Sequence, residues 1–193
     1  TMRLVKGRSL EDGLQEATSV AARLELLPHF VDLCNTMAYA HSRGVVHRDL
    51  KPENVMLGDF GETVVLDWGL AKVQGEADIQ EGALEDELER LKQQTSIKTV
   101  AGIPIGTPGY MPPEQALGQL SQVDERSDVY SLGVILYQLI TGKLPFDGAN
   151  AKEVIDKLLD ETAPPADEVE PDCPPELAAI VRRAMQKNPK RRY

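Results

Sequence analysis

The sequence is poor in cysteine and has no long apolar run. Its two cysteines, Cys34 and Cys173, are too few for a disulfide framework, and neither stands in a cluster of metal-ligating residues. This usage favours a reducing compartment, and we expect a cytoplasmic protein with no signal peptide at its start. The most apolar stretch, 130–140, is interrupted by a serine, a glycine and a glutamine. A membrane-spanning helix needs about 20 apolar residues, so this stretch predicts a buried helix and no membrane contact.

Basic residues are scarce as well. There are 21 lysines and arginines against 31 acidic residues, which gives a formal net charge of -10. Nucleic acid and anionic membranes would repel such a surface, so neither is an expected partner. Between residues 76 and 89 the chain has acids and no base: Glu76, Asp78, Glu81, Glu85, Asp86, Glu87 and Glu89. This acidic insert is interpreted as a solvated loop, with a docking surface for a basic partner as the alternative.

Length and hydrophobic periodicity predict one mainly helical domain. The 193 residues suffice for a single core. Ser9 suits an N-cap, with Asp12 three residues later, and predicts a short helix over 10–17. Further helices are expected over 27–42, 127–141, 151–160 and 175–187. Two β-prone runs, 55–57 and 63–66, flank turn-forming residues and predict a hairpin. Residues 164–175 are expected to form a loop, and 70–112 a long polar stretch. The expected fold class is mainly α with a small β-hairpin.

The most informative stretch for a possible reaction is His47-Arg48-Asp49-Leu50-Lys51-Pro52-Glu53-Asn54. Phosphoryl transfer requires a base beside the attacking hydroxyl, cations at the phosphates and ligands for a metal. Asp49 can accept the hydroxyl proton, Lys51 can neutralise the γ-phosphate, and Asn54 can bind Mg²⁺ through its amide oxygen. Taken singly, these residues would be read as a packed histidine and surface charges. Their combination in this order favours catalysis.

The octet resembles the catalytic loop of the protein-kinase superfamily. The lysine two residues after the aspartate resembles the pattern of the serine/threonine branch, because tyrosine kinases carry alanine or arginine near that position. The resemblance implies a protein-kinase-like C-terminal lobe that uses ATP and Mg²⁺ and acts on protein substrates. Over the whole chain it implies a hinge at 1–7, the catalytic loop at 47–54, and an activation segment at 67–114 that contains the acidic insert.

The second metal motif could be placed at either of two sites. The family's Asp-Phe-Gly is spelled literally at Asp59-Phe60-Gly61, but a strand rises about 3.3 Å per residue, so Asp59 would lie roughly 16 Å from Asn54 at the hairpin tip. The return strand brings the chain back beside Asn54, and the next residue is Asp67. Asp67-Trp68-Gly69 is therefore predicted to be the metal motif, with tryptophan in place of phenylalanine.

Two further segments match the family pattern. Residues 106–114 resemble the segment that cradles the acceptor residue, which implies that Thr107 hydrogen-bonds Asp49 and Lys51. The resemblance also implies that Asp128 accepts hydrogen bonds from catalytic-loop amides. It pairs Glu114 with an arginine near the end of the chain. Pattern matching makes that residue Arg192, with Arg191 as an adjacent rival.

The first residues are similar to a gatekeeper and hinge. Met2 would be the gatekeeper, and the backbone of Arg3 and Val5 would meet the adenine edge. The resemblance implies three further nucleotide contacts. Met56 and Leu10 would pack beneath the base, and Ser9 would lie near the ribose.

Arg48 beside the catalytic aspartate suits a kinase whose loop is ordered by a phosphate. The position four residues before Thr107 is Ile103, which cannot be phosphorylated. Thr99 is the first candidate phosphosite, followed by Thr95 and Ser96.

The family's glycine-rich loop, strand lysine and regulatory-helix glutamate have no counterpart in this sequence. We therefore expect a fragment that lacks the N-terminal lobe and is inactive alone, cut from a bacterial member of the eukaryotic-like serine/threonine kinases. A pseudokinase-type scaffold is the alternative from another class. A small-molecule phosphotransferase is disfavoured by Thr107 and the Pro113-Glu114 segment, which serve protein substrates.

Overall fold

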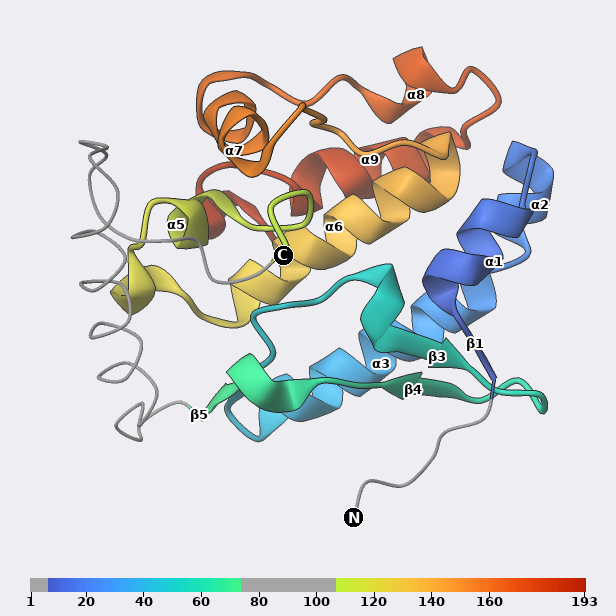
Figure 1. The fold of residues 1–193 in the computed structure, drawn as a ribbon, viewed down its shortest axis with the longest axis horizontal. Helices are drawn as coiled ribbons and strands as arrows, with labels where there is room; N and C mark the ends of the chain where they lie inside the picture. The colour runs from blue at the N-terminus through green and yellow to red at the C-terminus, as the bar shows by residue number, and fades with distance from the viewer. Residues whose placement is uncertain (1–6, 74–106) are drawn as a thin grey trace.

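The computed structural model describes residues 7–73 and 107–193 and is mostly helical (Figure 1). The long helix α6 (Glu125–Thr141) runs through the middle, with α7 (Ala151–Asp160), α8 (Ala166–Val169) and α9 (Pro175–Ala184) on one side of it. On its other side lie α3 (Leu27–Ser42) and a small sheet. The remaining short helical segments are α1 (Leu10–Glu16), α2 (Val20–Leu24), α5 (Pro113–Ala116), η1 (Pro52–Asn54), η2 (Trp68–Leu70), η3 (Leu120–Gln122) and η4 (Pro189–Arg191).

The predicted hairpin is present and belongs to a larger sheet. Strand β3 (Val55–Leu57) pairs antiparallel with β4 (Thr63–Val65), as expected, and a third strand, β1 (Arg8–Ser9), pairs with β3 on its other edge. The two residues of β1 are too few to show a period of two, so the sequence did not predict this strand. The expectation of a hairpin alone is therefore corrected to a three-stranded antiparallel sheet.

A second small sheet joins the two ends of the predicted catalytic region. Strand β2 (Val45–Val46) comes just before His47, and β5 (Lys72–Val73) follows η2. They pair antiparallel, with Val46 opposite Lys72. This sheet was not predicted, because two-residue strands carry no periodic signal. It holds the segment before the predicted catalytic loop against the segment after Trp68-Gly69.

Helix α1 begins at a capping box. The Ser9 hydroxyl accepts a hydrogen bond from the Asp12 amide at 3.0 Å, and the Asp12 carboxylate accepts one from the Ser9 amide at 2.9 Å. The pKa of Asp12 is lowered, first by the Ser9 hydroxyl and then by the Ser9 amide, because both hydrogen bonds favour the charged form. These bonds satisfy amides that the first helical turn leaves without partners. The predicted N-cap is confirmed.

The central helix is buried along most of its length, as the apolar stretch predicted. Tyr130, Ile135 and Tyr137 are among its fully or almost fully buried side chains. It starts at Glu125, two residues before the expected position, because Asp124 caps it through the Arg126 amide. It ends at Thr141 and is capped by Gly142, whose φ of 68° is left-handed and suits glycine at a helix C-terminus.

The other predicted helices are found at the expected positions, but their ends do not all agree with the prediction. Helices α3 and α7 match, whereas α9 stops three residues before the expected 187. The segment expected to be a loop contains the one-turn helix α8, and α2 was not predicted at all. Such short helices have no repeating apolar face to read. Within the described ranges, no helix is long and apolar enough to cross a membrane.

Candidate active site

The predicted catalytic loop is anchored to the start of α6 by one carboxylate. The two oxygens of Asp128 accept hydrogen bonds from the His47 amide at 2.8 Å and the Arg48 amide at 2.9 Å. A third donor is His41 Nε2 on α3, at 2.8 Å. Arg48 is buried and has a φ of 71°, a left-handed conformation that costs a non-glycine residue about 1–2 kcal/mol. The Asp128 bonds offset this cost and hold the loop, as the resemblance implied.

Asp49, Lys51 and Thr107 lie together although the last is far from the others in sequence. Lys51 Nζ is 3.2 Å from a carboxylate oxygen of Asp49 and donates to the Thr107 hydroxyl at 2.8 Å. The Thr107 amide and hydroxyl donate to the other Asp49 oxygen at 3.1 and 3.4 Å. Both bonds expected for Thr107 are therefore present. The arrangement fixes the orientation of a carboxylate that remains partly open to solvent.

Asn54 and Asp67 lie at the same end of the hairpin. The pairing of Val55 with Val65 places Asn54 opposite Leu66, whose amide donates to the Asn54 carbonyl at 2.8 Å. Asp67 is the next residue along the chain. Asp59 lies in the turn at the opposite end of the two strands, where Gly58 and Glu62 close the turn. The register thus agrees with the placement of Asp67 beside Asn54 and of Asp59 at the tip.

The two residues offer a donor set that fits a hard cation. The Asn54 side-chain NH₂ donates to the Asp49 carbonyl at 3.0 Å, so the amide oxygen is the atom left to face a metal. Asp67 supplies a carboxylate. Two oxygen ligands with room for waters suit Mg²⁺ better than Zn²⁺, which prefers nitrogen and sulfur. Gly69 follows closely: a Cβ there would lie 3.2 Å from Asp67 Oδ1, so a larger residue would crowd that carboxylate.

His47 links the catalytic loop to the Asp67 motif. Its buried ring lies 3.0 Å from the Leu66 carbonyl through Nε2 and accepts from the Asp49 amide through Nδ1 at 3.3 Å. A carbonyl only accepts and an amide only donates, so the ring carries its proton on Nε2. Trp68 packs on this ring, with centroids 4.7 Å apart. His47 of the predicted loop and Trp68 of the Asp67 motif are therefore in direct contact.

Glu114 and Arg192 form the predicted ion pair. Both guanidinium NH₂ groups reach the carboxylate, at 2.7 and 2.8 Å, and Ser127 donates to the same carboxylate at 2.7 Å. The adjacent rival, Arg191, is exposed. The pairing therefore joins α5, the start of α6 and the end of the chain.

The structure describes only part of the expected nucleotide site. Ser9 and Met56 are direct partners in the β1–β3 pairing, so the strands bring them together. Leu10 has no exposed surface, which places it in the core and not where a ligand could touch it. The predicted hinge residues and phosphosites lie outside the described residues: Met2, Arg3, Val5, Thr95, Ser96 and Thr99.

Sequence reasoning missed two supporting residues. His41 lies within the predicted helix over 27–42 and hydrogen-bonds Asp128. Gln115 donates from its side chain to the Arg48 carbonyl at 2.9 Å, which ties α5 to the catalytic loop. The helical period could indicate that His41 faces inward, but neither partner could be read from the sequence because both contacts join distant segments.

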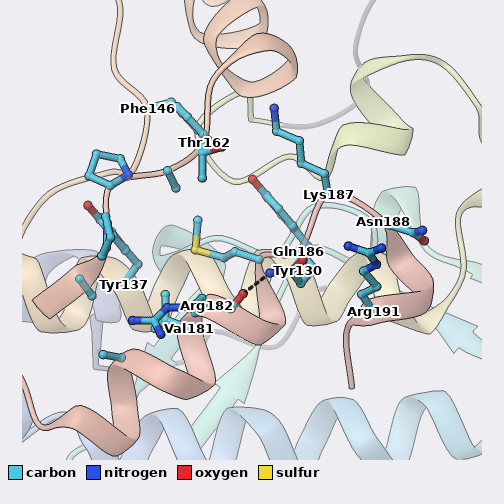
Figure 2. Close-up of a pocket in the computed structure, with 16 residues that line it drawn as sticks. Tyr130, Tyr137, Phe146, Thr162, Val181, Arg182, Gln186, Lys187, Asn188 and Arg191 are labelled. Atoms are coloured by element: carbon cyan, nitrogen blue, oxygen red, sulfur yellow. Dashed lines mark hydrogen bonds between the residues drawn. The ribbon is translucent and has the colours of Figure 1, made fainter.

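A separate cavity of about 430 Å³ lies between α6, α9 and the segment 162–166 (Figure 2). Tyr130 and Tyr137 from α6 and Val181 and Arg182 from α9 line it, and Arg182 accepts a hydrogen bond from Gln186 through its carbonyl. None of the predicted catalytic or metal residues lines this cavity. The cavity is therefore separate from the site that the sequence predicted.

Comparison with known proteins identifies the family to which the chain belongs. The sequence matches the protein kinase domain family over residues 1–193, and the chain belongs to this family. Among curated relatives, serine/threonine-protein kinase PknD of Chlamydia pneumoniae is 40% identical over 187 residues. That match covers 96% of this chain and 19% of the relative. PknD of Protochlamydia amoebophila is 49% identical over 123 residues, which cover 64% of this chain and 12% of that protein. The chain thus spans about a fifth of these relatives' length or less.

Proposed function

We propose that this chain is part of a serine/threonine protein kinase that transfers the γ-phosphoryl group of ATP to hydroxyls of protein substrates. The observation that carries the proposal is the convergence of Asp49, Lys51 and Thr107. A carboxylate held by the Thr107 amide and hydroxyl, with an ammonium 3.2 Å away, provides a base and a cation at one point. Phosphoryl transfer depends mainly on such positioning and charge stabilisation. The relatives named PknD belong to the same branch.

Each of these residues has a defined part in the proposed reaction. The substrate hydroxyl oxygen attacks the γ-phosphorus, the bond from that phosphorus to the bridging oxygen breaks, and the hydroxyl proton passes to Asp49. Lys51 neutralises charge on the transferred group. Thr107 keeps the Asp49 carboxylate and the Lys51 ammonium in their relative positions, because it bonds to both.

Protein kinases typically use ATP and Mg²⁺, and the donor set described above fits the ion. Asn54 and Asp67 would hold it, and bound Mg²⁺ would neutralise phosphate charge. Met56 and Ser9 would line the nucleotide site from β3 and β1, and Leu10 would support them from the core. Met2, Arg3 and Val5 remain proposed hinge contacts.

The proposal includes the expectation that the chain corresponds to the C-terminal lobe and is inactive alone. The phosphate-covering loop and the strand lysine of the family have no counterpart in its sequence. One side of a bound nucleotide would then face water, where electrostatic stabilisation is weak. We expect ATP to bind with a dissociation constant of about 1 mM or more, which corresponds to ~4 kcal/mol or less. A cytoplasmic location is a further expectation, based on the scarcity of cysteine.

A phosphotransfer assay tests the proposal. The gene product that contains this chain should label a serine- or threonine-containing protein with γ-phosphate, and Asp49→Asn should abolish labelling. Asp67→Asn should do the same, whereas Asp59→Asn is the matched control at the hairpin tip and should retain activity. The 193-residue chain alone should show negligible labelling. A gene product that is folded and binds partners but never transfers phosphate would support a scaffold and refute the proposal.

A further inference from the structure

Trp68 occupies a position for which the family pattern has phenylalanine, and its indole N–H makes a bond that phenylalanine cannot make. Nε1 donates to the Val65 carbonyl at 3.1 Å, which closes a tight turn over residues 65–68. Val65 is the last residue of β4, so its backbone is fixed by pairing with Val55. The bond therefore attaches the start of η2 to the end of a strand in the sheet.

Asp67 lies inside this turn in a strained conformation. Its φ of 58° and ψ of 63° are left-handed, which costs a non-glycine residue about 1–2 kcal/mol. Such a conformation persists only where the surroundings determine it. On one side Leu66 is held by the Asn54 carbonyl and by His47, and on the other side Trp68 is held by Val65. The two flanking residues thus fix the backbone on both sides of Asp67.

The indole ring adds a second contact. It packs on the His47 ring at 4.7 Å between centroids, and His47 accepts the Asp49 amide. A displacement of Trp68 would therefore disturb both the Asp67 backbone and the ring that supports Asp49. Because this contact needs only an aromatic ring, a phenylalanine could retain it while losing the N–H bond. The two contributions can thus be separated by mutation.

We propose that Trp68 is a positioning residue for the metal site: its N–H bond to Val65 holds Asp67 in the left-handed conformation beside Asn54. The inference rests on the proposed function, in which Asp67 binds Mg²⁺. Trp68 itself touches neither the metal nor the substrate. Loss of its N–H should weaken the use of Mg²⁺ and leave the recognition of protein substrate unchanged.

The first test measures Mg²⁺ dependence in the gene product that contains this chain. Trp68→Phe should raise the half-saturating Mg²⁺ concentration about three- to tenfold, the range expected for one lost hydrogen bond, with the KM for protein substrate unchanged. Trp68→Leu, which also loses the ring contact, should have a larger effect. Phe60→Leu is the matched control, because Phe60 is 97% exposed at the hairpin tip, and it should have no effect.

The outcomes separate this inference from the proposed function. If Asp67→Asn abolishes transfer and Trp68→Phe behaves like Phe60→Leu, the positioning role is refuted and the kinase proposal stands. If Asp67→Asn retains full activity, the metal assignment falls and this inference falls with it.

A second measurement needs no activity and no variant. Trp68 is the single tryptophan of the chain, so the 193-residue chain has one indole N–H resonance. Its hydrogen exchange should be at least about tenfold slower than in free tryptophan, because a hydrogen-bonded N–H exchanges only when the turn opens. Exchange as fast as in the free amino acid would overturn the proposal even if Trp68→Phe failed to fold.

Discussion

Glu114 and Arg192, 78 residues apart, form a two-point ion pair whose side chains are 2% and 0% exposed. The Arg192 guanidinium also donates to the carbonyls of Arg126, Gln186 and Lys187, and it lies 4.9 Å from the centroid of the Tyr130 ring. These contacts surround both charges with hydrogen-bonding partners. Such a network ties the end of the chain to α5 and α6.

Removal of one partner of this pair should be strongly destabilising. Arg192→Met should lower the free energy of unfolding in urea by about 3–5 kcal/mol, because Glu114 is left charged and buried without its partner. Adding Glu114→Gln to Arg192→Met should restore part of the loss. Arg191→Met is the matched control at the exposed neighbour and should change stability little. An equal effect of Arg191→Met and Arg192→Met would contradict the assignment.

Asp128 should be needed to hold the predicted catalytic loop. Asp128→Asn replaces one acceptor oxygen by an NH₂ group, which cannot accept the His47 or Arg48 amide. We expect a loss of about 3 kcal/mol in unfolding free energy, since a hydrogen bond to a charged group contributes ~1.5–3 kcal/mol. Amide exchange at His47 and Arg48 should accelerate. Asp147→Asn, at a side chain that is 95% exposed, should leave both measurements unchanged.

The Thr107 hydroxyl should matter for turnover. Thr107→Val keeps the shape and the backbone bond to Asp49 but removes the hydroxyl that Lys51 contacts. In the gene product that contains this chain, kcat should fall about 10- to 100-fold, the range for a lost hydrogen bond to a charged group. Thr107→Ser should retain most activity. A Val variant with the kcat of the Ser variant would show that the hydroxyl plays no part.

Alkaline pH should destabilise the chain partly through Cys34. Burial raises the pKa of this thiol from 9.0 to about 11. Above pH 9 the unfolded chain therefore releases a proton that the folded chain still holds, so unfolding becomes easier as pH rises towards 11. The contribution is at most about 2–3 kcal/mol, from ~1.36 kcal/mol per pKa unit.

Cys34→Ala isolates this contribution. Between pH 8 and pH 11 of a urea-unfolding series, approximately the range between the two pKa values, the variant should lose less stability than the parent chain. The pKa of Tyr110 and Tyr130 is also raised by burial and acts in the same direction in both proteins. Parallel pH profiles for the variant and the parent would exclude a role for Cys34.

Phosphorylation of the predicted activation segment is the last expectation. Thr99, with Thr95 and Ser96 as alternatives, lies outside the described residues, so the prediction rests on the sequence. Mass spectrometry of the active gene product should find phosphate on at least one of the three. The Asp49→Asn variant should lack it if the modification is autophosphorylation. A gene product that is active with none of the three modified would refute this prediction.

Local chemistry was sufficient to predict several elements of this protein. Ser9 and Asp12 define a cap within four residues, and the rise per residue of a strand separates Asp67 from the literal motif at Asp59. The apolar run at 130–140 required a buried helix because it was too short for a membrane and too apolar for the surface. These features depend on neighbouring residues only, so a single sequence contains all the information they need.

The remaining features depend on contacts between distant segments. The sequence showed two adjacent arginines near its end, and the resemblance favoured Arg192, but only the fold shows that this one reaches Glu114. The bonds from His41 to Asp128 and from Trp68 to Val65 likewise follow from how helices and strands pack. Strand β1 exists because β3 offers it an edge. Tertiary packing brings such side chains together. Composition, spacing and hydrophobic periodicity describe neighbouring residues only, so they do not show which distant residues will be in contact.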